Sequence, residues 1–297
     1  MSDVLSSVDP WTEAQVGDGL GVPVAIGGPL TSSALLGAYR RAIFCQPRSD
    51  QTEIARDEAT YGPDVRAGDI PVLPGNGNPY ARLWWSPSIR YVIPVDRVHM
   101  SRSLRKSIRT HDWVTTLDAD FDGVIDGCRG DREPRWITDE LMAALRALKE
   151  AGWVHTVEVW SDDRLIGGLF GCAMGSVFIM ESAFHRTSDA AKVAIADLAV
   201  RAGASGITLL DTEVKNDYTL QLGAQPMSRE DYVAELGTRA GPTEIQADRR
   251  YAQHLLSNFA QPLSAHGEAD FVQRSAGSPG ARANGVDLSR SKMGFGR

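Results

Sequence analysis

The sequence lacks several features that would define whole classes of protein. No apolar run reaches the roughly 20 residues that a membrane-spanning helix needs. Residues 1–19 are acidic, without the basic stretch and apolar core of a secretory signal. Cysteines are few and odd in number, and Cys45, Cys128 and Cys172 have no metal-ligand spacing. We therefore expect a cytoplasmic protein that spans no membrane and holds no metal ion.

Positive charge is also in the minority. The 297 residues carry a net charge of −7, which argues against a protein that coats nucleic acid indiscriminately. One segment departs from this balance, since a single acid, Asp96, stands among Arg90, Arg97, Arg102, Arg105, Lys106 and Arg109. Two interpretations stay open: a basic surface for one defined anionic ligand, or an ordinary solvated helix face.

The first half of the chain predicts a small unit interrupted by irregular sequence. A Gly-Gly turn precedes a helix that begins at Thr31 or Ser32 and reaches Ile43. Residues 46–82 are rich in Gly, Pro and Asp, which indicates a long surface excursion. We then expect two short strands around a Ser-Pro turn at 83–95, a basic helix at 101–110, a strand at 113–117 and a helix at 120–128.

The second half alternates helices and strands more regularly. Thr138 caps a helix that ends at Gly152. Strands are expected at 156–160, 164–174, 176–184 and 207–214, and helices at 190–201, 216–222 and 229–236. This order predicts an α/β (α+β) protein with an acetyltransferase-like mixed sheet and flanking helices, preceded by a small N-terminal α+β domain.

These elements suggest four regions. Residues 1–24 would form an irregular arm, 25–112 the small domain with a long insertion at 46–82, and 113–240 the catalytic domain. Residues 241–297 have few large apolar side chains and are expected to be mostly disordered, with 247–262 as one ordered piece.

The phosphate-binding loop of coenzyme A enzymes is missing from the place where this fold would carry it. Such loops use glycines so that backbone N–H groups at a helix N-terminus can hold a pyrophosphate. Here the segment 186–191 has no glycine, and Asp189 would repel phosphate. No coenzyme A and no other cofactor is therefore expected.

Motifs along residues 25–236 carry a resemblance to a known family. They are, in order, AIGG with AYRR and IF, LWWSP, HMSRSLR, WIT, HTVEVW, GGLFG, ES, AAK, Asp211 and LGA. As an ordered set they resemble the leucyl/phenylalanyl-tRNA–protein transferases. The resemblance implies an enzyme that uses aminoacyl-tRNA as donor and a protein or peptide N-terminus as acceptor.

The implied reaction moves leucine or phenylalanine onto proteins that begin with Arg or Lys, marking them for degradation. Two alternatives stay open. One keeps the tRNA donor but uses another amino acid or a small-molecule amine as acceptor, because Gln46, Met180 and Glu213 replace the residues usual in the family. The other is a non-catalytic adaptor that binds tRNA or protein N-termini.

Candidate catalytic residues are carboxylates at predicted strand ends. Asp211 and Glu213 would share one strand face by the period of two, and two nearby carboxylates raise one pKa toward a useful range. They would organise and deprotonate the acceptor amine, whereas Glu181, at the end of the strand 176–184, would hold its positive charge. A solvated acidic strand end is the alternative for Asp211 and Glu213.

Candidate binding residues follow the same resemblance. Tyr39, Trp85 and Trp136 would stack on the terminal adenosine or line the pocket, although buried aromatics usually serve packing. Met180 would shape the pocket or face the opposite layer as core. The remaining candidates are Met174, Ser182 and Phe184 for the aminoacyl pocket, and Arg102, Arg105, Lys106 and Arg109 for the tRNA backbone.

Overall fold

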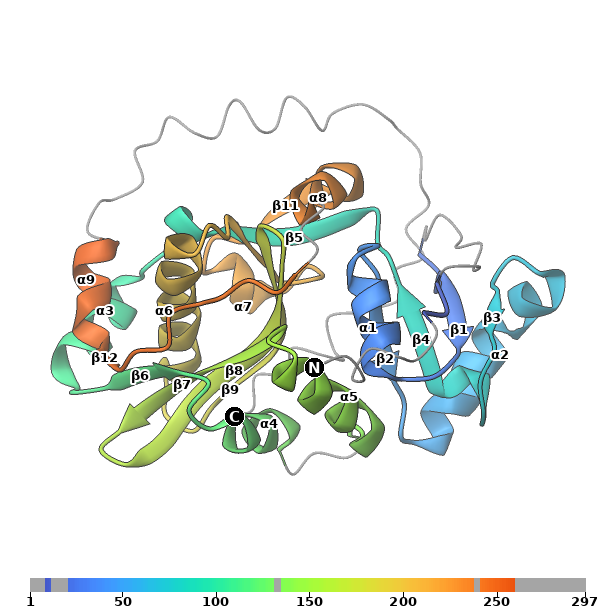
Figure 1. Ribbon diagram of the computed structural model, residues 1–297, viewed down its shortest axis with the longest axis horizontal. Helices are drawn as coiled ribbons and strands as arrows, with labels where there is room; N and C mark the ends of the chain where they lie inside the picture. The colour runs from blue at the N-terminus through green and yellow to red at the C-terminus, as the bar shows by residue number, and fades with distance from the viewer. Residues whose placement is uncertain (1–8, 12–20, 131–134, 238–240, 260–297) are drawn as a thin grey trace.

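The computed structural model describes residues 9–11, 21–130, 135–237 and 241–259. Its strands form two sheets, and Figure 1 shows the smaller one to the right of the larger one. Most of the expected arm at 1–24, and the tail from residue 260, lie outside the described residues. No described helix is long and apolar enough to cross a membrane.

The N-terminal unit is built on a four-stranded sheet. Its strand order is β2 (Phe44–Pro47), β4 (Arg82–Trp85), β1 (Ala25–Gly27) and β3 (Val72–Leu73), with β1 and β3 parallel. Helix α1 (Ser32–Tyr39) begins where predicted, because the Thr31 side chain accepts from the backbone N–H of Ala34. A small α+β unit thus precedes the main sheet, as expected.

The surface excursion expected over residues 46–82 contains regular secondary structure. Residues Gln51–Ala67 form helix α2, and η1 (Pro79–Ala81) follows. Asp50 caps α2 at its start, and Gly68 ends it in the left-handed conformation. Ile54 and Tyr61 bury one side of α2 in a cluster with Phe44, Leu83 and Trp85, so the segment has a core of its own.

The main sheet has eight strands and mixed direction, which confirms the predicted fold class. Its order is β11 (Gln225–Ser228), β5 (Ile89–Pro94), β10 (Leu209–Asp211), β9 (Val177–His185), β8 (Arg164–Met174), β7 (Val154–Ser161), β6 (Val114–Leu117) and β12 (Arg250–Tyr251). Strands β9 and β10 run parallel, and β10 runs antiparallel to β5.

The two strands expected around the Ser-Pro turn belong to different sheets. β4 pairs with β1 and β2, whereas β5 pairs with β10 and β11. β5 lies within the range 25–112 assigned to the N-terminal domain, yet it is part of the main sheet. The chain therefore passes from one sheet to the other at Ser86-Pro87, well before residue 112.

Helices cover both faces of the main sheet. α4 (Phe121–Arg129) and α5 (Asp139–Glu150) share one hydrophobic cluster with α1 and with Phe170, Met174 and Phe184. α3 (Arg102–Thr110), α6 (Ala190–Ala204) and α9 (Leu255–Asn258) share the other. Short elements η2 (Val95–Arg97), α7 (Asp217–Leu220), α8 (Arg229–Leu236) and η3 (Ala252–His254) complete the fold.

Candidate active site

A hydrogen bond between the N-terminal unit and the main sheet marks one half of the site. The hydroxyl of Tyr39, at the end of α1, donates to Oε1 of Glu181 on β9 over 2.7 Å. Both residues are buried. Glu181 is the extra residue of a β-bulge, because Phe170 pairs with Ser182 and Gly171 pairs with Met180. The bulge interrupts the alternation of β9 side chains between the two faces of the sheet, and it does so at Glu181, the residue that contacts the N-terminal unit.

Tyr39 is held as a neutral donor. Burial raises the pKa of its phenol well above the ordinary value, and the charge of Glu181 raises it further. Cys172, in the same cluster, has a raised thiol pKa because it is buried and also lies near Glu181. The thiol is therefore inert as a nucleophile, consistent with its place in the apolar core.

A buried ion pair forms the other half. The guanidinium of Arg90 on β5 pairs with Asp211 at the end of β10, and Tyr232 on α8 donates its hydroxyl to Asp211 over 2.6 Å. We call Arg90, Asp211 and Tyr232 the arginine triad. Arg90 also lies over the rings of Phe44 and Tyr232, 5.2 and 4.7 Å from their centroids.

The arginine triad corrects the sequence analysis on one point. Arg90 was grouped with a basic surface, yet it is only 1% exposed and faces the interior. Burial disfavours its charge, but Asp211, Tyr232 and Glu213 together more than offset this, so the pKa of Arg90 is raised. Arg90 and Tyr232 are the site residues that the sequence analysis missed, since no local motif marks either.

Glu213 does not follow the predicted strand geometry. The strand expected over 207–214 ends at Asp211, and Glu213 has a φ of +62°, in the left-handed region. Its backbone N–H donates to Oδ1 of Asp211 over 2.7 Å. The period of two therefore cannot relate the two carboxylates, and a tight turn places them instead.

Electrostatics nevertheless couple Glu213 to both halves. Its carboxylate contributes to the raised pKa of Tyr39 on one side and of Arg90 on the other. Glu213 is itself 3% exposed. Glu181, Asp211 and Glu213 thus belong to one buried electrostatic neighbourhood, in which Arg90 supplies a compensating positive charge.

Some predicted pocket residues gather on the same face of the main sheet. Tyr39, Met174 and Phe184 share one cluster, and Trp136 stacks on Phe170 with ring centroids 6.5 Å apart. Gly127 lets α4 approach closely, because an added Cβ would lie 2.5 Å from the ring of Phe184. Ser182 is buried next to Glu181.

Other predicted residues lie elsewhere. Met180 belongs to the cluster on the α6 face, opposite Met174 and Phe184. Trp85 packs in the cluster of the N-terminal unit, edge-on to Tyr61 at 6.1 Å. Gln46 is buried on β2 of the same unit.

The predicted tRNA-binding cations lie on α3, at the edge of the main sheet away from α1 (Figure 1). Arg102, Lys106 and Arg109 are exposed. Arg105 is not equivalent to them, because it donates to the backbone carbonyls of Met100 and Phe259. Across the described ranges, no group of three or more His, Cys, Asp or Glu residues could hold a metal ion.

Comparison with known proteins gives the family. Residues 92–237 match a family model described as leucyl/phenylalanyl-tRNA protein transferase. A curated protein of that name from Shewanella baltica (strain OS185) is 36% identical over 230 residues, which are 76% of this chain and 84% of the relative. The chain belongs to this family.

Further leucyl/phenylalanyl-tRNA–protein transferases give the same result. The protein of that name from Jannaschia sp. (strain CCS1) is 42% identical over 170 residues, covering 57% of this chain and 79% of the relative. That from Xylella fastidiosa (strain M23) is 34% identical over 228 residues, covering 75% and 82%. The resemblance drawn from the motifs is confirmed.

Proposed function

We propose that the protein is an aminoacyltransferase that moves leucine or phenylalanine from aminoacyl-tRNA to the N-terminal amine of proteins beginning with Arg or Lys. Family membership supports the donor and the reaction class. The observation that carries the proposal is the buried convergence of Glu181, Asp211 and Glu213 with Arg90 and Tyr39. We place the protein in the cytoplasm, where aminoacyl-tRNA is found.

The reaction needs few chemical groups. The acceptor nitrogen attacks the carbonyl carbon of the aminoacyl ester, a C–N bond forms, and the bond to the ribose oxygen breaks. The proton lost by the amine finally resides on that ribose oxygen. Because an N-terminal amine has a pKa of about 8, a modest base is sufficient.

The carboxylates are suited to different roles. Asp211 already accepts from Arg90, Tyr232 and the backbone of Glu213, so it organises the site. Glu213 lies on a turn between the two halves and would take the proton from the acceptor amine. Glu181, oriented by Tyr39, would stabilise the positive charge that the amine carries.

The donor would be held by two kinds of surface. Met174, Phe184 and Trp136 belong to the apolar face beside Glu181 and suit the side chain of leucine or phenylalanine. Arg102, Lys106 and Arg109 on α3 would contact the phosphates of the tRNA.

One observation favours a second candidate function. Glu213 places a carboxylate within electrostatic range of Arg90 and Tyr39, at a position where the family resemblance implies a glutamine. A second negative charge beside Glu181 suits a more strongly cationic acceptor. The alternative is therefore a tRNA-dependent transferase with another amino acid or a small-molecule amine as acceptor.

A single assay separates these candidates. The purified protein is incubated with tRNA charged with leucine, phenylalanine or a third amino acid, and with a peptide that begins with Arg. A mass gain of one leucine or phenylalanine supports the proposal, and an N-acetylated copy of the peptide should gain nothing. Transfer only of the third amino acid, or only to a small amine, supports the alternative. Saturable tRNA binding without turnover would contradict both.

A further inference from the structure

Residues 241–259, which we call the clasp, lie beyond the residues matched by the family model. The clasp runs from residue 241 along the α6 face and adds β12 to the edge of β6, pairing Arg250 with Thr115 and Tyr251 with Val114. Ile245, Ala252, Leu255 and Phe259 are buried in the cluster shared with α3 and α6. Elements β12, η3 and α9 lie within the range 247–262, of which the structure describes residues 247–259.

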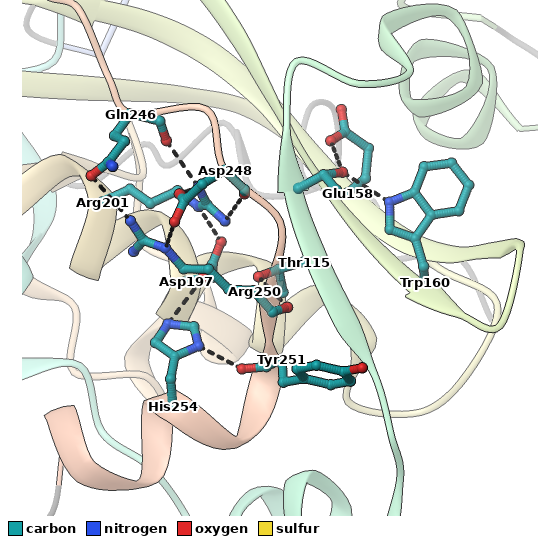
Figure 2. Close-up of polar contacts among 11 residues, drawn as sticks. Thr115, Glu158, Trp160, Asp197, Arg201, Gln246, Asp248, Arg250, Tyr251 and His254 are labelled. Atoms are coloured by element: carbon teal, nitrogen blue, oxygen red, sulfur yellow. Dashed lines mark hydrogen bonds and ion pairs between the residues drawn. The ribbon is translucent and has the colours of Figure 1, made fainter.

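A fully buried arginine fastens the clasp to α6. Nε of Arg201 donates to Oδ2 of Asp197 on the same helix over 2.6 Å. Its Nη1 donates to Oδ1 of Asp248 over 2.6 Å and to the carbonyl of Gln246 over 2.9 Å, and its Nη2 donates to the carbonyl of Asp248 over 2.9 Å. Figure 2 shows this arrangement. Most of the bonds from Arg201 therefore go to the clasp.

Two further contacts surround Arg201. Nε of Arg250 lies 2.8 Å from Oδ2 of Asp248, which orients that carboxylate from the other side. The ring of His254 lies between acceptors, with Nδ1 2.7 Å from the carbonyl of Tyr251 and Nε2 3.2 Å from Oδ1 of Asp197 (Figure 2). The network links α6, the strand β12 and the turn η3.

The clasp in turn holds helix α3. The carbonyl of Phe259 accepts from Arg105 in the middle of α3, and Gln253 donates to Asp112, just after its end, over 3.3 Å. On the other side Ser107 donates to Asp189, at the start of α6, over 2.8 Å. Helix α3 is therefore fixed between α6 and the clasp, with Arg102, Lys106 and Arg109 exposed.

We infer that the clasp is a positioning element for tRNA binding, which acts through α3. The inference rests on the proposed function. Cations on a helix fixed in advance bind phosphates without the cost of ordering that helix on association. Asp248 and Arg201 touch no substrate; they hold the segment that holds α3. The expected signature of this role is a change in the KM for tRNA with little change in kcat.

The test uses full-length Asp248→Ala. This change removes the carboxylate that Arg201 contacts in the clasp, while the bonds from Arg201 to the carbonyls of residues 246 and 248 remain. Arg201 also stays paired with Asp197, so no buried charge loses every partner. Hydrogen exchange of the α3 amides is expected to rise about tenfold, as local opening becomes easier. The KM for tRNA is expected to rise several-fold at unchanged kcat. Asp248→Asn, which keeps an acceptor oxygen, should bring both the exchange rate of α3 and the KM for tRNA back toward the wild-type values.

The control is Arg146→Met, which breaks an exposed ion pair with Asp122 on the opposite face of the main sheet. It should change neither the hydrogen exchange of α3 nor the KM for tRNA. Unchanged exchange of α3 in Asp248→Ala would overturn the inference, as would faster exchange with an unchanged KM. A wild-type protein that neither binds nor consumes tRNA would instead refute the proposed function, and the exchange data would still show whether the clasp holds α3.

Discussion

Tyr39 and Glu181 are 142 positions apart in the sequence, and the 2.7 Å hydrogen bond between them joins the N-terminal unit to the main sheet. The bond is buried, and the bulge in β9 makes it possible by displacing Glu181 from the regular pairing with β8. Neither residue could reach the other without both sheets in place.

Replacement of Tyr39 by Phe leaves the buried Glu181 without this donor. We expect a loss of about 1–3 kcal/mol in the free energy of unfolding, measured by urea denaturation, together with lower transferase activity. Tyr61→Phe is the matched control, because Tyr61 is also buried and its hydroxyl makes no hydrogen bond within the described residues. Equal stability of the two variants would show that the bond to Glu181 contributes nothing.

Replacement of Arg90 by Met isolates Asp211 as a buried charge. Breaking such a pair from one side costs about 3–5 kcal/mol of stability, whereas the double variant Arg90→Met, Asp211→Asn should recover part of it. Urea denaturation of the single and double variants measures the coupling. If the losses of stability caused by Arg90→Met and by Asp211→Asn simply add in the double variant, the two residues do not stabilise the fold as a pair.

Variants of Glu213 separate a base from a positioning group. Glu213→Ala should lower kcat by about 10²–10⁴-fold if the carboxylate takes the proton from the amine. Glu213→Gln, which introduces the amide that the family resemblance implies, should keep measurable transfer. An unchanged rate in Glu213→Ala would remove Glu213 from the chemistry, provided that the urea midpoint shows an intact fold.

The exposed cations of α3 give a prediction about salt. Lys106→Ala combined with Arg109→Ala should weaken tRNA binding and reduce the slope of log Kd against log salt by about one for each phosphate that α3 no longer neutralises. Arg164→Ala removes an exposed positive charge from β8 and is the control. The same salt slope in the α3 variant and the control would exclude α3 from the tRNA surface.

Glu158 provides a pH-dependent test of stability. It is fully buried on β7 and accepts from Thr116 and Thr156, both over 2.5 Å, and Trp160 in turn donates to Thr116 over 2.8 Å. Burial raises the pKa of Glu158 above 4.5, and the threonine hydroxyls offset this only in part. The native protein therefore holds this proton more tightly than the unfolded chain does.

The sign of the effect follows from linkage. Stability due to protonated Glu158 is fully present below the unfolded pKa of about 4.3 and is lost as pH rises through the higher folded pKa. Glu158→Gln cannot titrate, so its stability relative to wild type should rise as the pH increases above the unfolded pKa of Glu158. Urea denaturation at a series of pH values measures the difference in the free energy of unfolding between Glu158→Gln and wild type. A difference that does not change with pH would contradict a raised pKa of Glu158.

The sequence predicted what depends on local pattern. The helix from Thr138, the hairpin of β8 and β9, and helix α3 with its Ser101 cap follow from periodicity and capping residues. Helix α2 was missed because Gly62 and Pro63 interrupt its sequence, although Asp50 and Gly68 marked both of its ends.

The site was less predictable because its partners are distant in sequence. Asp211 and Glu181 were predicted from expected strand ends; Asp211 does end β10, whereas Glu181 lies inside β9 at its bulge. The partner of Asp211 is Arg90, 121 positions away, and only the order of strands in the main sheet brings β5 beside β10. The left-handed φ of Glu213 likewise arises where β10 ends early, a boundary that the pattern of residues 207–214 does not reveal.

Because Tyr39, Arg90, Glu181, Asp211 and Tyr232 come from separate elements, the site can exist only after contacts between residues up to 142 positions apart have formed. A nascent or half-folded molecule would not have these five residues assembled into a site. Catalytic competence would then coincide with completion of folding, which would spare charged tRNA from wasteful discharge by immature copies.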